Sequence, residues 1–230
     1  MVRYSTVLFD ADNTLFDFYR SEREALMDAL RSMGVCPTQE MVAVYSKINE
    51  SMWKMLERGE ITKTALREAR FARFCEHYGF SLDVPQLAVR YTDFLAQKGY
   101  LMQGVYEACR ALAESCRLYI ITNGISTVQR GRFEPSVLRP FFRDLFISEE
   151  LGYEKPRKEY FEAVAAAIPN FDARSTLVVG DSLTSDMQGG INAGLDTCWV
   201  NPHGKPVPAD MPITYVVKSA EEVVPLVLGA

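Results

Sequence analysis

The chain has 230 residues, of which 48% are hydrophobic and 24% are charged, which is ordinary for a globular protein and excludes a disordered chain or a fibre. The formal net charge of −5 argues against a sequence-independent nucleic-acid binder, because such proteins cluster positive charge. No apolar run reaches the roughly 18 residues of a membrane-spanning helix, and the first acid, Asp10, comes too early for a signal peptide. The five cysteines are scattered without a C-x-x-C pair, as expected of reduced thiols. We expect a cytoplasmic protein.

Four short apolar runs predict buried strands, because they are rich in β-branched or aromatic residues and do not alternate with polar ones. Segments with helical apolar stripes lie between them. This alternation predicts an α/β fold, a doubly wound parallel sheet of the Rossmann-like kind. The predicted strands are residues 7–9, 118–121, 177–179 and 198–200, and the helical segments include 104–115, 158–168, 185–193 and 220–228.

The segment 17–99 differs, because its apolar residues follow helical spacing and it holds no clear strand. A structureless excursion of this length would be unusual inside a domain. We therefore expect an all-helical domain, residues 17–99, inserted into an α/β core of residues 1–16 and 100–230.

Polar side chains follow three of the predicted strands. Because ligands bind outside the carboxyl ends of parallel strands, we expect these side chains to share one crevice. Lys155 lies in a connection between two strand–helix units and could reach the same edge. The residues are Asp10, Asp12 and Thr14 after the first strand, Thr122 and Asn123 after the second, and Asp181 and Asp186 after the third.

Acids gathered in one crevice repel each other unless a cation or protons neutralise them. Mg²⁺ takes carboxylates together with phosphate oxygens, and Mn²⁺ accepts the same oxygen ligands, so the sequence does not choose between them. Lys155 and Thr122 would donate to phosphate oxygens. A dinucleotide site is excluded, since no G-x-G-x-x-G follows the first strand.

These residues resemble the four ordered motifs of the haloacid dehalogenase superfamily, and the inserted helical domain resembles the cap that many members carry. The resemblance covers the whole core. The motifs are Asp10-x-Asp12-x-Thr14, Thr122 closing a hydrophobic strand, Lys155-Pro156, and Gly180-Asp181-x-x-x-x-Asp186.

The resemblance implies a role for each residue. Asp10 would be the nucleophile that becomes an aspartyl-phosphate, and Asp12 the general acid and base. Asp12 also favours phosphate-ester hydrolysis over dehalogenation, because dehalogenases lack this second acid. Thr122, Asn123 and Lys155 would bind the phosphoryl group. Asp10, the backbone carbonyl of Asp12 and Asp181 would ligate Mg²⁺, and Asp186 would bond to these ligands or reach the ion through a water.

A narrower resemblance is to the bacterial pyrimidine 5′-nucleotidases of this superfamily, which implies a pyrimidine nucleoside monophosphate as substrate. Two alternatives stay open: a phosphatase for another small metabolite, such as a sugar phosphate or phosphoglycolate, and a phospho-accepting signalling module without turnover. The preferred base and sugar and the oligomeric state also stay open. The segments that carry the resemblance are residues 9–16, 59–62, 121–124, 147–152 and 189–201.

Aromatic side chains in or near the inserted domain could stack on a nucleobase, a contact that contributes about 1–3 kcal/mol. Most of them are expected to pack the domain's own helices instead. The candidates are Phe16, Phe18, Tyr19 and Trp53.

Overall fold

The computed structural model describes residues 2–229. Its contacts divide the chain into two compact units, Met1–Asp17 with Tyr100–Ala230, and Phe18–Gly99. The division falls one residue from the expected start of the inserted domain. We call the first the core unit and the second the helical unit, and describe each by itself.

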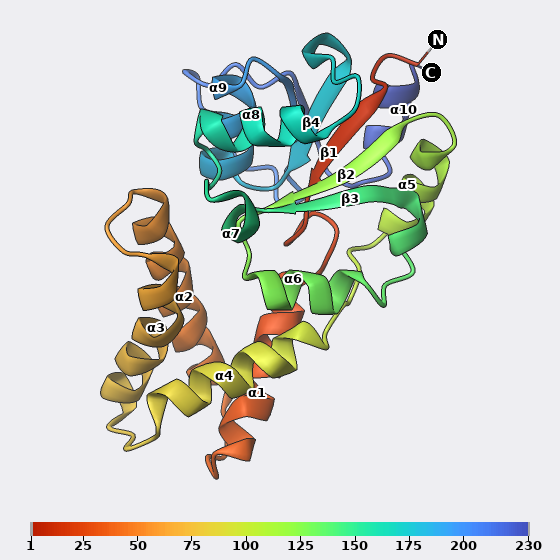
Figure 1. The fold of residues 1–230 in the computed structure, drawn as a ribbon. Helices are drawn as coiled ribbons and strands as arrows, with labels where there is room; N and C mark the ends of the chain where they lie inside the picture. Colours follow the sequence, from red (N-terminus) through yellow and green to blue (C-terminus); the bar gives the residue numbers. More distant parts are fainter. Residues whose placement is uncertain (1, 230) are drawn as a thin grey trace. The chain divides into compact units, whose positions relative to one another are not determined.

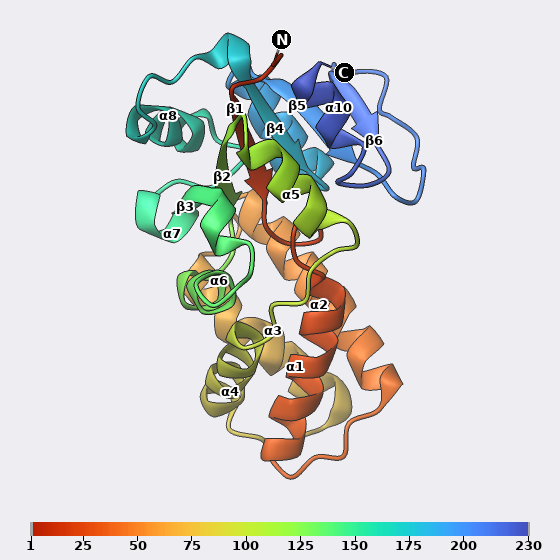
Figure 2. The ribbon, with the colours of Figure 1, turned by 90° about the vertical axis from the view of Figure 1, so that its right-hand side faces the viewer.

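Within the described part of the core unit, the strands form one six-stranded parallel sheet in the order β3-β2-β1-β4-β5-β6 (Figures 1 and 2). The predicted fold class, a doubly wound parallel sheet, is confirmed. The central strands are buried on both faces, as their uninterrupted apolar sequences predict. The strands are β1 (Thr6–Asp10), β2 (Arg117–Thr122), β3 (Phe142–Ile147), β4 (Thr176–Gly180), β5 (Asp196–Val200) and β6 (Tyr215–Val217).

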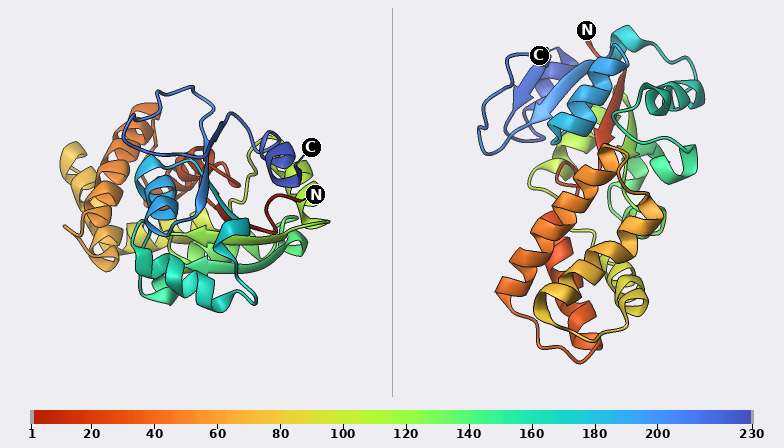
Figure 3. Two further views of the ribbon diagram at one scale, coloured as in Figure 1. Left: turned by 90° about the horizontal axis from the view of Figure 1, so that it is seen from above. Right: turned by 90° about the vertical axis from the view of Figure 1, so that its left-hand side faces the viewer.

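Helices cover both faces of this sheet (Figure 3). On one face, Val105 and Leu112 of α5 and Val223 of α10 pack against Val7 and Phe9 of β1. The other face forms a separate apolar cluster, whose residues include Leu8 of β1, Val178 of β4, and Tyr160 and Val164 of α8. The helices of the core unit are α5 (Val105–Ala113), α6 (Ser126–Phe133), α7 (Ser148–Leu151), α8 (Lys158–Ala167), α9 (Gln188–Asn192) and α10 (Val223–Leu228), with short turns η1 (Arg139–Phe141), η2 (Ala173–Ser175) and η3 (Leu183–Met187).

The register of the sheet brings the ends of three strands together. Asp10, the last residue of β1, lies opposite Ile121 of β2, one residue before Thr122. On the other side, Phe9 lies opposite Val179 of β4, one residue before Gly180. The polar residues that follow these strands therefore begin at the same edge.

The helical unit consists, within residues 18–99, of α1 (Phe18–Ser32), α2 (Gln39–Glu57), α3 (Lys63–Tyr78) and α4 (Val84–Ala96). Side chains of Thr38, Thr62 and Asp83 cap the starts of α2, α3 and α4 by accepting backbone N–H groups. The core holds stacked and edge-on aromatic rings, including Tyr45 and Phe71, whose centroids lie 5.1 Å apart. Across residues 2–229, no helix is both long enough and apolar enough to span a bilayer.

Candidate active site

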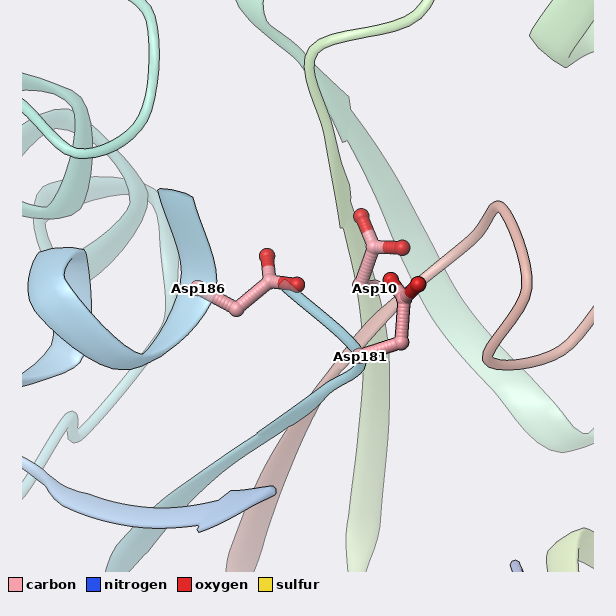
Figure 4. Close-up of side chains that lie close together, drawn as sticks. All are labelled: Asp10, Asp181 and Asp186. Atoms are coloured by element: carbon pink, nitrogen blue, oxygen red, sulfur yellow. The ribbon is translucent and has the colours of Figure 1, made fainter. Parts of the chain in front are cut away.

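Three carboxyl groups converge at the carboxyl edge of the sheet. Asp10 ends β1, Asp181 directly follows β4, and Asp186 lies in η3, a single π-helical turn. Among the described residues, one oxygen from each lies within 4.8 Å of the others, and Figure 4 shows the Asp186 carboxyl group directed toward those of Asp10 and Asp181. The structure therefore brings together three acids that the sequence placed after two different strands.

The turn after β4 is built to aim Asp186 inward. The backbone N–H of Ser182 donates to Oδ2 of Asp186 over 3.1 Å, and the Ser182 hydroxyl caps the turn by accepting from the N–H of Ser185. A Cβ atom on Gly180 would lie 2.3 Å from that Asp186 oxygen. Only glycine allows the carboxylate this close to the strand end.

Lys155 pairs with two of these acids. Its Nζ donates to Oδ1 of Asp10 over 2.6 Å, to Oδ1 of Asp186 over 2.7 Å and to the carbonyl of Ile121 over 3.0 Å. The side chain is 1% exposed. Its three donors are thus all satisfied, as a buried ammonium requires.

The side chain of Asn123, a predicted phosphate contact, bonds the backbone of Lys155 in the structure. Its side-chain amide donates to the carbonyl of Lys155 over 2.8 Å and accepts from the N–H of Lys155 over 2.9 Å. Both amide atoms are therefore occupied, and Asn123 holds the backbone of the lysine.

Thr122 is buried at the end of β2, with its N–H donating to the hydroxyl of Tyr160. Its own hydroxyl oxygen accepts from the N–H of Gly124 over 3.0 Å. The hydroxyl proton is left as the group that could reach a phosphate oxygen.

Asp12 does not join the acid cluster, because its carboxylate is held from α6. Arg132 donates through Nη2 to Oδ1 over 2.5 Å, and Gln129 donates through Nε2 to Oδ2 over 2.7 Å. Sequence reasoning missed both partners. Their only signal is a spacing of three positions, which puts them on one helix face.

The loop that carries Asp12 is tightly turned. Asn13 has a φ of 59°, in the left-handed region that asparagine and aspartate tolerate better than most residues. The N–H groups of Leu15 and Phe16 both donate to the carbonyl of Ala11. This turn places Asp10 and Asp12 on one short segment while it buries Phe16.

Comparison with known proteins agrees with this geometry. The family model for haloacid dehalogenase-like hydrolases matches residues 4–194. The chain belongs to this family. The predicted superfamily and the prediction of an enzyme are thereby confirmed.

Full-length relatives of this hydrolase are similar over nearly the whole chain. YfnB of Bacillus subtilis (strain 168), named as a HAD-hydrolase, is 42% identical over 96% of this chain and 94% of its own. Pyrimidine 5′-nucleotidase PynA of Streptococcus pneumoniae (strain ATCC BAA-255 / R6) is 40% identical over 95% and 93%. Pyrimidine 5′-nucleotidase YjjG of Escherichia coli (strain K12) is 33% identical over 96% and 96%. A crystal structure of YfnB, described as bound to magnesium, superimposes with a TM-score of 0.93, covering 98% of this chain and 99% of that one.

The acid cluster of this hydrolase suits a hard divalent cation, since its ligand atoms are carboxylate oxygens. Burial, together with the Asp186 charge, raises the pKa of Asp10 well above its ordinary value, although Lys155 opposes the shift. Burial and the same charge raise the pKa of Asp181 to about 7. Burial lowers the pKa of Lys155, but the carboxylates of Asp10 and Asp186 outweigh it and raise that pKa overall. Lys155 supplies one positive charge beside three carboxyl groups, and a cation would balance the remaining negative charge.

We expect the metal-free hydrolase to lose stability as the pH rises from about 6 to about 8. Asp181 stays protonated in the folded protein up to a pH of about 7, whereas unfolded aspartate releases its proton near pH 4. The stabilisation is complete below the unfolded pKa and disappears above the folded one, a change on the order of 1 kcal/mol over this interval. Thermal unfolding in EDTA measures it.

Asp181→Asn is the control for this pH effect, because it removes one titrating carboxyl group and should make the loss of stability between about pH 6 and about pH 8 smaller. Added Mg²⁺ should stabilise the wild-type protein more at the higher pH, where the carboxylate is free to bind it. A metal-free wild-type protein whose unfolding temperature is the same across this range would contradict the expectation.

The four aromatic candidates for substrate contact differ in exposure. Phe16 is fully buried in the core unit, so its ring is not available for stacking on a base and that prediction is wrong for this structure. In the helical unit, Tyr19 is 66% exposed, whereas Phe18 is partly buried. Trp53 is also partly buried and packs on the cluster of Met52, Leu56 and Leu66.

Proposed function

We propose that this hydrolase is a Mg²⁺-dependent phosphatase that removes the 5′-phosphate from a pyrimidine nucleoside monophosphate. The observation that carries the proposal is the convergence of Asp10, Asp181 and Asp186 around Lys155, with a second acid, Asp12, on the same loop as Asp10. The names of PynA and YjjG, both pyrimidine 5′-nucleotidases, support the substrate class.

In the proposed reaction, a carboxylate oxygen of Asp10 attacks phosphorus while the bond from phosphorus to the ester oxygen breaks. Asp12 gives its proton to the departing nucleoside oxygen, so that a neutral hydroxyl leaves. Asp12 then takes a proton from water, whose oxygen attacks the aspartyl-phosphate. The bond between Asp10 and phosphorus breaks, and inorganic phosphate is released.

Asp10 and Asp181 are the proposed carboxylate ligands of the metal, with the backbone carbonyl of Asp12. Mg²⁺, when bound, would neutralise charge on the phosphoryl oxygens. Asp186 is not proposed as a direct ligand, because its two oxygens already accept from Lys155 and from the N–H of Ser182. Lys155 and the Thr122 hydroxyl would hold the phosphoryl group in line with Asp10.

The test is phosphate release from a panel of monoesters by the purified protein. We expect the highest kcat/KM for uridine, deoxyuridine or thymidine monophosphate, and loss of release in EDTA that Mg²⁺ restores. A higher kcat/KM for sugar phosphates or phosphoglycolate would overturn the nucleotide assignment. Phosphorylation of Asp10 without turnover of any ester would favour a signalling module instead.

The helical unit is proposed to act as the cap of this phosphatase, and Tyr19 as a contact to the leaving group. Tyr19→Ala should raise KM for the nucleotide about 5- to 10-fold, the loss of one stacking contact, and leave KM for p-nitrophenyl phosphate nearly unchanged. Because Tyr19 is 66% exposed, Tyr19→Ala should lower the unfolding temperature less than the loss of a packed ring does. Trp53→Ala is the contrasting variant, since its packing should make it less stable. Equal KM changes for both esters would contradict the Tyr19 role.

A further inference from the structure

Asp12 is fixed by two donors from one helix. Arg132 Nη2 bonds Oδ1 and Gln129 Nε2 bonds Oδ2, so each carboxylate oxygen has its own donor. The same Arg132 nitrogen also donates to Oε1 of Gln129 over 3.0 Å. The three side chains therefore form a closed triangle of hydrogen bonds. The two residues of α6 in this triangle fix both side-chain torsion angles of Asp12.

Burial of the Arg132 side chain costs folding free energy, a cost that a residue that only stabilised the fold would not need. Its side chain is fully buried, and its guanidinium lies over the ring of Phe16 at 5.3 Å from the centroid. Among the described residues, Nε and Nη1 of this arginine have no hydrogen-bond partner. An unsatisfied buried donor costs about 1–3 kcal/mol, and an apolar side chain would fill the same space without that cost.

Gly124, in the loop after β2, leaves room for the Gln129 side chain, the second donor to Asp12. A Cβ atom on Gly124 would lie 1.9 Å from Nε2 of Gln129, the atom that bonds Asp12. Gly124 also donates its N–H to Thr122. A side chain at position 124 would therefore displace Gln129 from Asp12 without changing either residue.

We propose that Gln129 and Arg132 are positioning residues, which hold the Asp12 carboxyl group where it can pass its proton to the leaving oxygen. The inference rests on the proposed phosphatase reaction and adds two residues that act through Asp12. A proton transfer needs the acid within about 2.6–3.2 Å of the oxygen that receives it. A short side chain held at both oxygens keeps that geometry better than one that rotates freely.

The test compares esters whose leaving groups need a proton to different degrees. A nucleoside hydroxyl is a poor leaving group and depends on the acid, whereas p-nitrophenolate leaves without one. We expect Arg132→Met and Gln129→Leu to lower kcat/KM for the nucleotide about 100-fold, the lower end of general-acid contributions, and for p-nitrophenyl phosphate by less than about 5-fold. Gly124→Ala should show the same selective defect, and Arg132→Lys should recover part of the loss because its ammonium can still reach Asp12.

The matched control is Arg130→Gln. Arg130 lies on the same helix but is 46% exposed and pairs with Glu150, away from Asp12, so both esters should be hydrolysed at wild-type rates. Equal losses on the two esters in the Arg132 and Gln129 variants would overturn the proposal and leave a structural role.

Crystal structures of wild type, Gln129→Leu and Arg132→Met separate this inference from the proposed function, because they need no activity. A changed Asp12 side-chain conformation in the variants supports positioning. An unchanged conformation overturns it, even if the wild-type protein hydrolyses every ester in the panel. A wild-type protein that hydrolyses none would instead overturn the proposed function.

Discussion

Asp10→Asn is expected to reduce phosphate release at least about 10⁴-fold, since loss of a covalent nucleophile leaves only binding and electrostatic contributions. The amide cannot form an aspartyl-phosphate, but it keeps the shape of the side chain at the end of β1. Its oxygen can still accept the hydrogen bond that Lys155 now donates to Oδ1. The variant should therefore fold and bind substrate while it fails in chemistry.

Two measurements check the Asp10 result. Mass spectrometry after rapid acid quench should find one added phosphoryl group on wild type and none on Asp10→Asn. Asp210→Asn, an exposed acid in the loop between β5 and β6, is the matched control and should retain wild-type turnover. Substantial turnover by Asp10→Asn would assign the attack on phosphorus to another group, such as water.

The strands that carry the site could be predicted because they are apolar throughout. β1, β2, β4 and β5 are central or nearly so, and both of their faces are covered. β3 escaped prediction because its exposed Arg143 and Asp144 interrupt the run, as befits an edge strand. β6, the opposite edge, has only Val217 buried and offers too short a pattern.

The site residues were predictable to different degrees for a physical reason. Parallel topology alone brings the ends of β1, β2 and β4 together, so Asp10, Thr122 and Asp181 follow from the strand pattern. The partners of Asp12 do not, because Gln129 and Arg132 look like any polar pair on a surface helix. Whether such a helix turns its polar face outward or toward a neighbouring loop is decided by packing.

Lys155→Met is expected to destabilise the protein by about 3–5 kcal/mol in EDTA, the usual cost of breaking a buried ion pair by removing one partner. Asp10 and Asp186 would lose the ammonium that now bonds both of them. Asp181, whose pKa is raised to about 7 by burial and by the Asp186 charge, would face two uncompensated neighbours. Urea unfolding at a pH above that value measures the loss where Asp181 is ionised.

Lys158→Met is the matched control for Lys155→Met. Lys158 pairs with Glu162 over 3.0 Å but is 63% exposed, and surface pairs of this kind contribute about 0–1 kcal/mol. Mg²⁺ should restore more stability to Lys155→Met than to wild type, because the ion would then be the main positive charge beside the acids. If the Lys155 and Lys158 variants unfold at the same urea concentration, protons rather than Lys155 neutralise the three acids. Repeating the urea unfolding at a higher pH distinguishes these two causes. If protons neutralise the acids, a higher pH lowers the stability of both variants equally. If Lys155 neutralises them, a higher pH lowers the stability of Lys155→Met more than that of Lys158→Met.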